Sequence, residues 1–242
     1  MASVNLIEAT KVYCSMIFNQ SCQCLLCGQT QRSPVCPLCL AMLARLDGPL
    51  CRCGLPHPAG DPGNTLPAPL CGRCLKRPPS FTVSQAPLHY RFPLDHLIRR
   101  YKYRGDLVAE RGIEKLLTDT PCPWPEMDAL CPLPAHWYRR WWRGFDQSQR
   151  LTDRLATLWK IPCLPALQRR QSTPMQQGLS RSQRQRNLRG AFACTRPVSG
   201  LRLILVDDVM TTGSSARAAS DCLLRQGAAE VRVWTLARTP ER

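Results

Sequence analysis

Residues 203–215 combine residue types that can hold a phosphate group. The segment reads Leu-Ile-Leu-Val-Asp-Asp-Val-Met-Thr-Thr-Gly-Ser-Ser. Its first four residues are apolar, as expected of a strand that is buried on both faces. Gly213 lets the backbone approach an anion closely, and the neighbouring hydroxyls and the N–H groups of a following helix can bind phosphate oxygens. The segment therefore predicts a strand, a tight turn and a helix that bind a phosphorylated ligand.

Two adjacent carboxylates, Asp207 and Asp208, stand at the end of the predicted strand, just before this turn. Ligands of open α/β sheets bind at the carboxyl ends of the strands, so both acids are expected in the site. Carboxylates repel phosphate, and the groups that they would bind are ribose hydroxyls or Mg²⁺. The alternatives are a capped turn with exposed acids and a Walker-B strand, but no G-x-x-x-x-G-K-[ST] loop occurs in the chain.

Ten of the fifteen cysteines precede residue 80, and eight of these form closely spaced pairs. The pairs are Cys24 and Cys27, Cys36 and Cys39, Cys51 and Cys53, and Cys71 and Cys74. In a reducing compartment, two thiolates on one tight turn point to a shared Zn²⁺, and two such turns complete a tetrahedral site. We therefore predict structural Zn²⁺ bound by the first two pairs and by the last two. Crossed pairing, a single ion, and a set of inert buried cysteines are the open alternatives, and the short gap between Cys51 and Cys53 puts that pair in doubt.

The positive charge of the chain is concentrated in its central part. The whole sequence has a net charge of +16, and residues 136–190 hold 12 basic and 2 acidic side chains. Such a surplus indicates an anionic partner, either nucleic acid or a phosphorylated small molecule. Arg139, Arg140 and Arg143 can neutralise a bound anion, and residues 169–190, which include Arg184, are typical of a lid that closes over an anion. The alternative for both segments is a solvated basic loop.

Aromatic residues are interleaved with the first of these arginine clusters. They are Trp137, Tyr138, Trp141, Trp142 and Phe145. Aromatic rings can stack on bases while arginines neutralise phosphates, so single-stranded DNA is a second expected partner. The alternative is that the rings pack in the core, and we favour it for at least two of them.

The elements that must position these groups follow from the spacing of apolar residues. Strands are predicted over 83–90, 128–133, 203–207 and 230–237, and helices over 93–103, 107–118, 147–159 and 214–226. Gly227 ends the last helix. Strands that alternate with helices indicate an α/β fold with a parallel sheet.

The domain organisation follows from a change in composition near residue 80. A loop rich in Pro and Gly spans residues 55–69, and a linker begins at residue 76. We predict a Cys-rich zinc-ribbon module over residues 1–80 and an α/β domain over residues 81–242. No apolar run approaches the ~20 residues that span a bilayer, and no signal peptide is recognised, so we expect a cytoplasmic protein.

The strand, the two acids and the Thr-Thr-Gly turn of residues 203–215 resemble the motif of type I phosphoribosyltransferases that binds 5-phosphoribosyl 1-pyrophosphate (PRPP). With the cysteine pairs added, nearly the whole chain resembles the ComF/GntX family. Residues 98–105, 132–147 and 169–192 carry that likeness and resemble the family's first helix, pyrophosphate loop and hood segment. The chain departs from the family at Cys51-x-Cys53, where C-x-x-C is usual.

The resemblance implies a role for each part of the site. Asp207 and Asp208 would hold the ribose hydroxyls, and with Arg143 they are the expected catalytic residues. The expected PRPP-binding residues are Lys102, Arg139, Arg140, Arg184, Val209, Met210, Thr211, Thr212, Gly213, Ser214 and Ser215. Mg²⁺ would accompany PRPP, and Zn²⁺ would be structural.

Three functions fit these features. The first is a Mg²⁺-dependent phosphoribosyltransferase, although no residues in the sequence identify an acceptor base. The second is a protein that handles nucleic acid, because the resemblance implies a part in competence or in the use of external DNA, with single-stranded DNA and the competence machinery as partners. The third is a regulator that binds PRPP without turnover.

Overall fold

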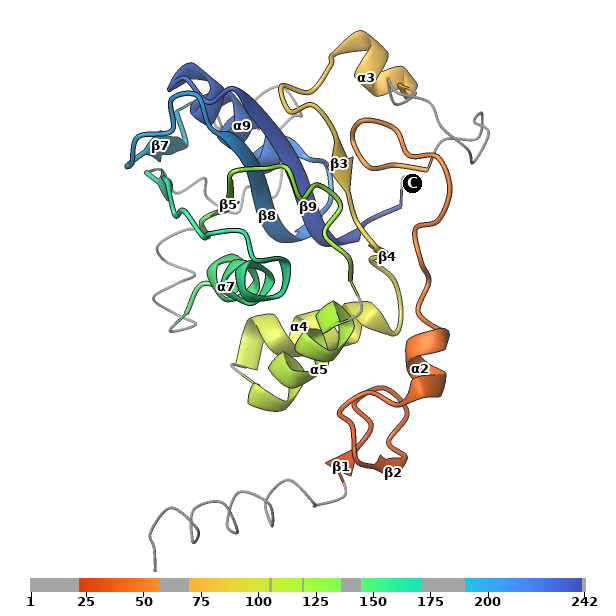
Figure 1. Cartoon of the computed structure of the whole chain (residues 1–242). Coiled ribbons are helices and arrows are strands. Elements are labelled where there is room, and N and C mark those ends of the chain that lie inside the picture. The colour runs from red at the N-terminus through yellow and green to blue at the C-terminus, as the bar shows by residue number, and fades with distance from the viewer. Residues whose placement is uncertain are drawn as a thin grey trace, which may run out of the picture.

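The computed structural model describes residues 22–56, 70–104, 106–118, 120–135, 145–170 and 190–240. Its centre is a parallel sheet in which the strands follow the order β3-β9-β8-β5, with β4 also paired to β9 (Figure 1). These strands are β3 (Ser84–Gln85), β4 (Leu88–His89), β5 (Ala129–Pro132), β8 (Arg202–Met210) and β9 (Glu230–Arg238). The predicted α/β fold with a parallel sheet, preceded by a Cys-rich segment, is confirmed.

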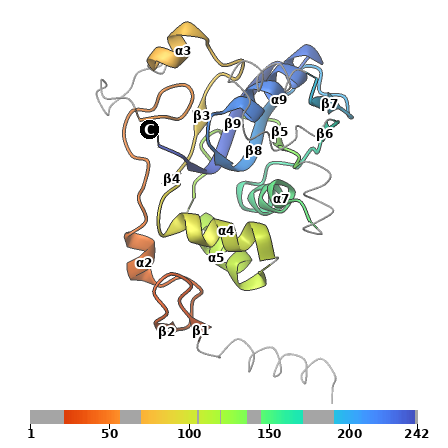
Figure 2. The same ribbon diagram turned by 180° about the vertical axis from the view of Figure 1, so that it is seen from behind.

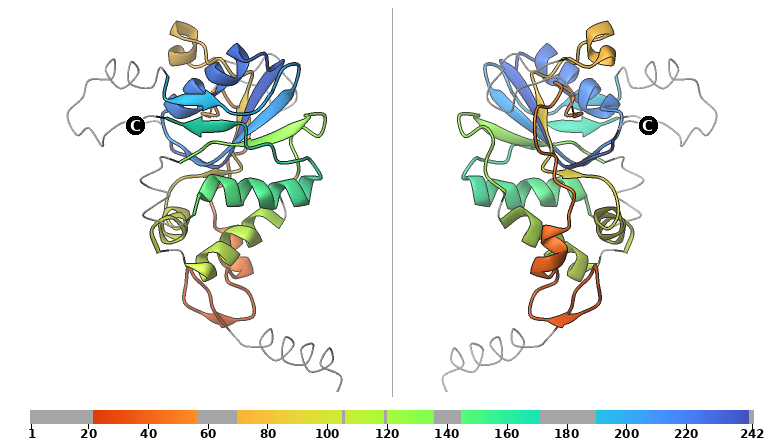
Figure 3. Two further views of the ribbon diagram at one scale, coloured as in Figure 1. Left: turned by 90° about the vertical axis from the view of Figure 1, so that its left-hand side faces the viewer. Right: turned by 90° about the vertical axis from the view of Figure 1, so that its right-hand side faces the viewer.

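The central strand β8 is buried on both faces because its apolar side chains alternate between two cores. Ile204 and Val206 belong to one core, and Leu203 and Leu205 to the other. Helices α4 (Leu94–Arg104), α5 (Leu107–Thr118) and α7 (Gln147–Trp159) cover the first face, and α9 (Ser214–Arg225) covers the second. Figures 2 and 3 show these helices on opposite sides of the sheet.

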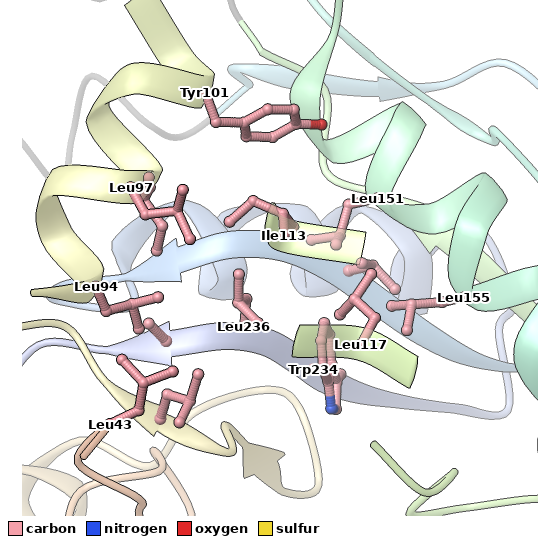
Figure 4. Close-up of a cluster of buried hydrophobic side chains, with 14 of the residues drawn as sticks. Leu43, Leu94, Leu97, Tyr101, Ile113, Leu117, Leu151, Leu155, Trp234 and Leu236 are labelled. Atoms are coloured by element: carbon pink, nitrogen blue, oxygen red, sulfur yellow. The ribbon is translucent and has the colours of Figure 1, made fainter. Parts of the chain in front are cut away.

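The larger core is closed by aromatic and aliphatic side chains from three helices. Figure 4 shows Leu97 of α4, Ile113 of α5 and Leu155 of α7 converging on β9. There Trp234 is buried and meets the ring of Trp159 edge-on, with ring centroids 5.4 Å apart. Burial of these side chains holds α4, α5 and α7 against this face of the sheet.

Most predicted elements occur close to their expected bounds, and two differ. α5 and α7 begin and end at the predicted residues. The strand predicted over 83–90 is interrupted between β3 and β4, where Pro87 has no N–H to donate to a ladder. β8 runs past its predicted end at residue 207 to Met210, so the two acids lie within the strand.

A short antiparallel pair adds to the predicted elements beside the second core. β6 (Leu167–Arg169) pairs with β7 (Phe192–Cys194). Each strand has three residues, which is too short for a hydrophobic period to predict it.

The described part of the Cys-rich segment contains short elements only. They are β1 (Cys22–Gln23), β2 (Thr30–Gln31), α2 (Pro37–Ala41) and α3 (Gly72–Lys76). Val35 of this segment packs into the same core as Leu94 and Leu97 of α4. The domain boundary at residue 80 stays a prediction. Among the described residues, no helix has the length and apolar character needed to cross a membrane.

Candidate functional site

Residues 209–215, the phosphate loop, join β8 to α9 in a turn suited to an anion. Gly213 has φ 74°, a left-handed conformation that favours glycine, and it caps the start of α9. Thr211 and Thr212 are exposed, and Thr212 Oγ1 lies 2.6 Å from Ser214 Oγ. The first N–H groups of a helix lack partners within the helix, so the loop presents hydroxyls and amides to one point.

Asp207, the first acid of the pair, is held by two hydrogen bonds. Its Oδ1 accepts from the Ser148 hydroxyl at 2.9 Å and from the Asp208 backbone N–H at 2.9 Å. Burial raises the pKa of Asp207 to about 7, the charge of Asp208 adds to the rise, and Lys102 and Ser148 oppose it. The Asp207 carboxyl therefore changes charge near neutral pH, which is unusual for an aspartate.

Asp208, the second acid, forms an ion pair with Lys102 of α4. Its Oδ2 lies 2.9 Å from Lys102 Nζ, and both side chains are largely buried. Burial alone would lower the pKa of Lys102, but the carboxylates of Asp208 and Asp207 more than offset this and raise it. Lys102 is therefore a fixed positive charge beside the acid pair.

The acid pair and the phosphate loop share one cavity of about 300 Å³. Its lining residues are Tyr90, Lys102, Leu133, Pro134, Ala135, Gln147, Ser148, Arg169, Asp207, Asp208, Val209, Thr211 and Ser215. An adjoining hollow of about 60 Å³ is lined by the rest of the phosphate loop, including Met210, Thr212, Gly213 and Ser214. Such a volume is at the lower end of the range for small-molecule sites, and its polar lining suits a phosphorylated sugar.

The structure brings Lys102, both acids and the phosphate loop together around these two hollows. Arg139, Arg140, Arg143 and Arg184 lie outside the described residues. The residues that flank segment 136–144 are described, and the backbone N–H of Ala135 donates to Asp146 Oδ2 at 3.1 Å. Ala135 and Gln147 both line the cavity, so the residues on either side of segment 136–144 lie beside the site.

Several residues of the cavity have no place in the sequence prediction. Ser148 reaches Asp207 from the first turn of α7, which Asp146 caps by accepting the Ser148 N–H at 3.1 Å. A capping aspartate after a basic loop is a signal for that helix start. Tyr90 carries no such signal, because only tertiary packing brings it to the cavity. Arg169, in contrast, is the first residue of the segment predicted to bind an anion, and it lines the cavity.

One ring of the interleaved aromatic cluster is described. Phe145 packs against Tyr101, with ring centroids 6.0 Å apart, and beneath the Arg150 guanidinium, 4.3 Å from the ring centroid. It therefore packs against the core, which is the alternative to base stacking. Trp137, Tyr138, Trp141 and Trp142 lie outside the described residues.

The eight paired cysteines gather in two groups of four, and within each group the sulfur atoms lie within 4.8 Å of one another. The first cysteine group is Cys24, Cys27, Cys36 and Cys39, and the second cysteine group is Cys51, Cys53, Cys71 and Cys74. The grouping matches the predicted pairing, leaves no crossed pairing among these residues, and includes Cys51, which is fully buried.

Backbone N–H groups support sulfur atoms in both groups. Cys36 N donates to Cys24 Sγ at 3.4 Å, and Cys71 N donates to Cys51 Sγ at 3.1 Å. Such bonds stabilise thiolates and orient metal ligands. Four thiolates in each group are the donor set of a closed, structural Zn²⁺ site.

Comparisons with known proteins found one domain family and several similar proteins. The family model of the phosphoribosyl transferase domain matches residues 166–242, which include β8, the phosphate loop, α9 and β9. The chain is 38% identical over 218 residues to the DNA utilization protein YhgH of Salmonella typhi, covering 85% of this chain and 90% of that protein. It is 35% identical over 180 residues to Competence protein F of Haemophilus influenzae, covering 69% of this chain and 78% of that protein.

A partial likeness to a solved structure was also found. The glutamine phosphoribosylpyrophosphate (PRPP) amidotransferase from B. subtilis, complexed with ADP and GMP, superposes with a TM-score of 0.36 and 23% sequence identity. The superposition covers 51% of this chain and 25% of that chain.

Proposed function

The chain belongs to the ComF/GntX family of competence and DNA-utilisation proteins, and from that membership we propose that it binds PRPP with Mg²⁺. The observation that carries the proposal is the single cavity in which the acid pair, Lys102 and the phosphate loop meet. Two carboxylates suit a ligand with neighbouring hydroxyls, and a helix N-terminus beside them suits a phosphate. A phosphoribosyl group carries both hydroxyls and a phosphate.

In this proposal each part of the cavity binds one part of the ligand. Asp207 and Asp208 accept hydrogen bonds from the ribose hydroxyls, and the phosphate loop donates to the 5′-phosphate. Arg139, Arg140, Arg143 and Lys102 supply positive charge for the pyrophosphate, and Arg184 belongs to a lid over the site. Carboxylate oxygens are donors that Mg²⁺ accepts, and the ion would neutralise charge on the pyrophosphate.

The rest of the chain supports that site. The donor sets of the two cysteine groups fit Zn²⁺, and in the second group the ion would hold together a segment with little core of its own. We place the protein in the cytoplasm, where thiolates stay reduced and PRPP would be met.

The proposal is tested by titration calorimetry with Mg-PRPP, ribose 5-phosphate and pyrophosphate. The double substitution Asp207→Asn/Asp208→Asn should lower the affinity for PRPP and for ribose 5-phosphate at least about tenfold, because each lost charge-assisted hydrogen bond is worth roughly 1.5–3 kcal/mol. The affinity for pyrophosphate should fall less. Asp128→Asn is the matched control, since Asp128 pairs with Arg202 at the amino end of β8. If wild-type protein shows no binding of Mg-PRPP, the proposal is wrong.

Release of pyrophosphate from PRPP, with each nucleobase offered in turn, separates a transferase from a regulator. In a transfer, the anomeric carbon would lose pyrophosphate through an oxocarbenium-like state that the carboxylates and arginines stabilise. Binding without release would assign the chain to the regulators.

Single-stranded DNA is the second ligand that we propose, and the net charge of +16 favours it. The logarithm of its association constant should fall linearly with the logarithm of salt concentration. Competition by Mg-PRPP would show that one basic surface serves both ligands. Binding that is independent of salt would argue against a phosphate-backbone contact.

A further inference from the structure

A buried arginine at the end of β9 connects the phosphate loop to the second cysteine group. Arg238 is 2% exposed, and its guanidinium donates to the Met210 carbonyl at 3.0 Å and to the Thr211 carbonyl. Its Nε donates to the Cys53 carbonyl at 3.1 Å. One guanidinium therefore fixes the start of the phosphate loop to the backbone of a cysteine in that group.

A second arginine connects the other end of the loop to the same group. Arg217 lies in the first turn of α9, and its backbone N–H donates to the Gly213 carbonyl at 2.9 Å. Its guanidinium donates to Cys74 Sγ at 3.7 Å and to the Arg77 carbonyl at 3.1 Å. Such a donor to a thiolate is typical of the residues that surround a metal site.

Direct packing adds a third contact between the two sites. Gly54 follows Cys53 with φ +71°, and a Cβ at this position would lie 2.9 Å from Ser84 Oγ and 3.5 Å from Met210 Cε. The positive φ and the close approach to Ser84 favour glycine at this position, and Met210 of the phosphate loop lies within van der Waals distance of the cysteine turn.

The first cysteine group lies elsewhere. A Cβ on Gly112 of α5 would lie 3.0 Å from Leu25, which stands between Cys24 and Cys27, and Val35 packs in the core under α4. Figure 1 shows α2, which carries Cys39, beside α4 and α5, and α3, which carries Cys74, at the opposite end of the molecule. The two groups therefore support different parts of the protein.

We propose that Zn²⁺ in the second cysteine group holds the phosphate loop in its binding conformation through Arg238 and Arg217, which act as positioning residues. The cluster around this group is small, so without the metal it cannot hold the Cys53 carbonyl and Cys74 Sγ in place. Both ends of the loop then lose their anchors. Loss of zinc from the second group, but not from the first, releases the loop.

The test compares the more exposed ligand of each group. Cys71→Ser and Cys27→Ser should each lower the zinc content measured by mass spectrometry. Amide hydrogen exchange over 209–215 should rise about tenfold or more in Cys71→Ser, whereas Cys27→Ser should raise exchange over 107–118 instead. Equal exchange over 209–215 in wild type and zinc-depleted Cys71→Ser would overturn the proposal.

Substitution of the arginines tests the same link with the metal kept. Arg238→Met and Arg217→Met should retain full zinc, raise exchange over 209–215, and weaken Mg-PRPP about tenfold, with Arg238→Lys in between. Arg232→Lys is the control, because Arg232 lies on the same strand but pairs with Glu126 and Glu230. If Arg238→Met does not fold, the Arg217→Met variant still tests the proposal. Amide exchange over 209–215 and an affinity for Mg-PRPP that both equal those of wild type in Arg217→Met would contradict it.

The ligand measurement rests on the proposed function, but the exchange measurement does not. If wild-type protein fails to bind Mg-PRPP, the proposed ligand is wrong. The link between the second cysteine group and the loop is then judged by exchange and zinc content alone.

Discussion

Lys102 Nζ lies 2.9 Å from Asp208 Oδ2, in an ion pair that joins α4 to the carboxyl end of β8. The ammonium group of Lys102 lies beside the acid pair because α4 is held in place by its packing. Leu97 and Ile98 of α4 are fully buried, and the amide of Gln147 on α7 donates to the Lys102 carbonyl at 3.2 Å. The charge balance of the cavity therefore depends on the packing of α4 against α7 and the sheet.

Removal of this ammonium should cost both stability and affinity. Lys102→Met leaves Asp208 buried without its cation, and we expect the free energy of unfolding to fall by about 1–3 kcal/mol. The affinity for Mg-PRPP should fall about tenfold as the cavity loses a positive charge. Urea unfolding and calorimetry measure the two effects.

The control for Lys102→Met is an exposed ion pair. Arg154→Met breaks the pair between Arg154 and Glu114, whose charged atoms are 3.7 Å apart on side chains 45% and 40% exposed. Exposed pairs contribute under about 1 kcal/mol, so this variant should stay close to wild type in stability and ligand binding. A Lys102→Met protein as stable as Arg154→Met would contradict our account of the buried pair.

The Asp207 carboxyl should make stability depend on pH. Its pKa rises from 3.8 to about 7 on folding, so the folded protein holds the proton more tightly than the unfolded chain does. The resulting stabilisation is fully present below the unfolded pKa and is lost as pH rises through the folded pKa. Between about pH 4 and pH 7, wild type should therefore lose stability relative to Asp207→Asn, as urea unfolding at each pH would measure.

Ligand binding should have the opposite pH dependence, because ribose hydroxyls donate to the ionised form of Asp207. As pH rises through neutrality, the affinity for ribose 5-phosphate should increase more in wild type than in Asp207→Asn. The variant serves as the reference because the phosphate of the ligand titrates equally in both measurements. Ser148→Ala removes a hydrogen bond that lowers the pKa of Asp207, so its midpoint should move to higher pH. Thr157→Ala, on the exposed face of the same helix, should leave the midpoint unchanged. Parallel pH profiles in wild type and Asp207→Asn would assign the dependence to another group.

Local patterns were sufficient to predict much of this site. α7 has an apolar stripe at Leu151, Leu155 and Leu158, and its bounds were predicted correctly. The acid pair and the Thr-Thr-Gly turn are contiguous in sequence, so their neighbourhood in space follows from one strand and one turn. The two cysteine groups were predictable for the same reason, since each is built from pairs separated by only one or two residues.

The contacts that sequence could not predict join residues far apart in the chain. Lys102 meets Asp208, Ser148 meets Asp207, and Arg238 meets Cys53, each across two packed elements. Nothing in the spacing around Arg238 distinguishes it from a surface arginine, because its burial depends on how β9 lies against the cysteine turn. Such positions are set by tertiary packing, which a single sequence does not encode in a short pattern.

The contact of the first cysteine group with α5 gives a further test at Gly112. Alanine favours a helix interior over glycine by about 1 kcal/mol, yet a Cβ here would lie 3.0 Å from Leu25 Cδ1 and 3.1 Å from Leu97 Cδ1. Because Leu97 is fully buried and cannot move away, overpacking of about 1–3 kcal/mol should outweigh the gain. We expect Gly112→Ala to lower the free energy of unfolding and to speed zinc loss to a chelator.

A double-mutant cycle with Leu25 separates helix propensity from packing. In a Leu25→Ala background one of the two close contacts is gone, so Gly112→Ala should be less destabilising there than in wild type. The difference in unfolding free energy between the two backgrounds measures how firmly the cysteine turn rests on α5. Equal effects in both backgrounds would show that Leu25 does not pack on Gly112, and the first cysteine group would then have to be held to α4 and α5 by Val35 and its neighbours in the core.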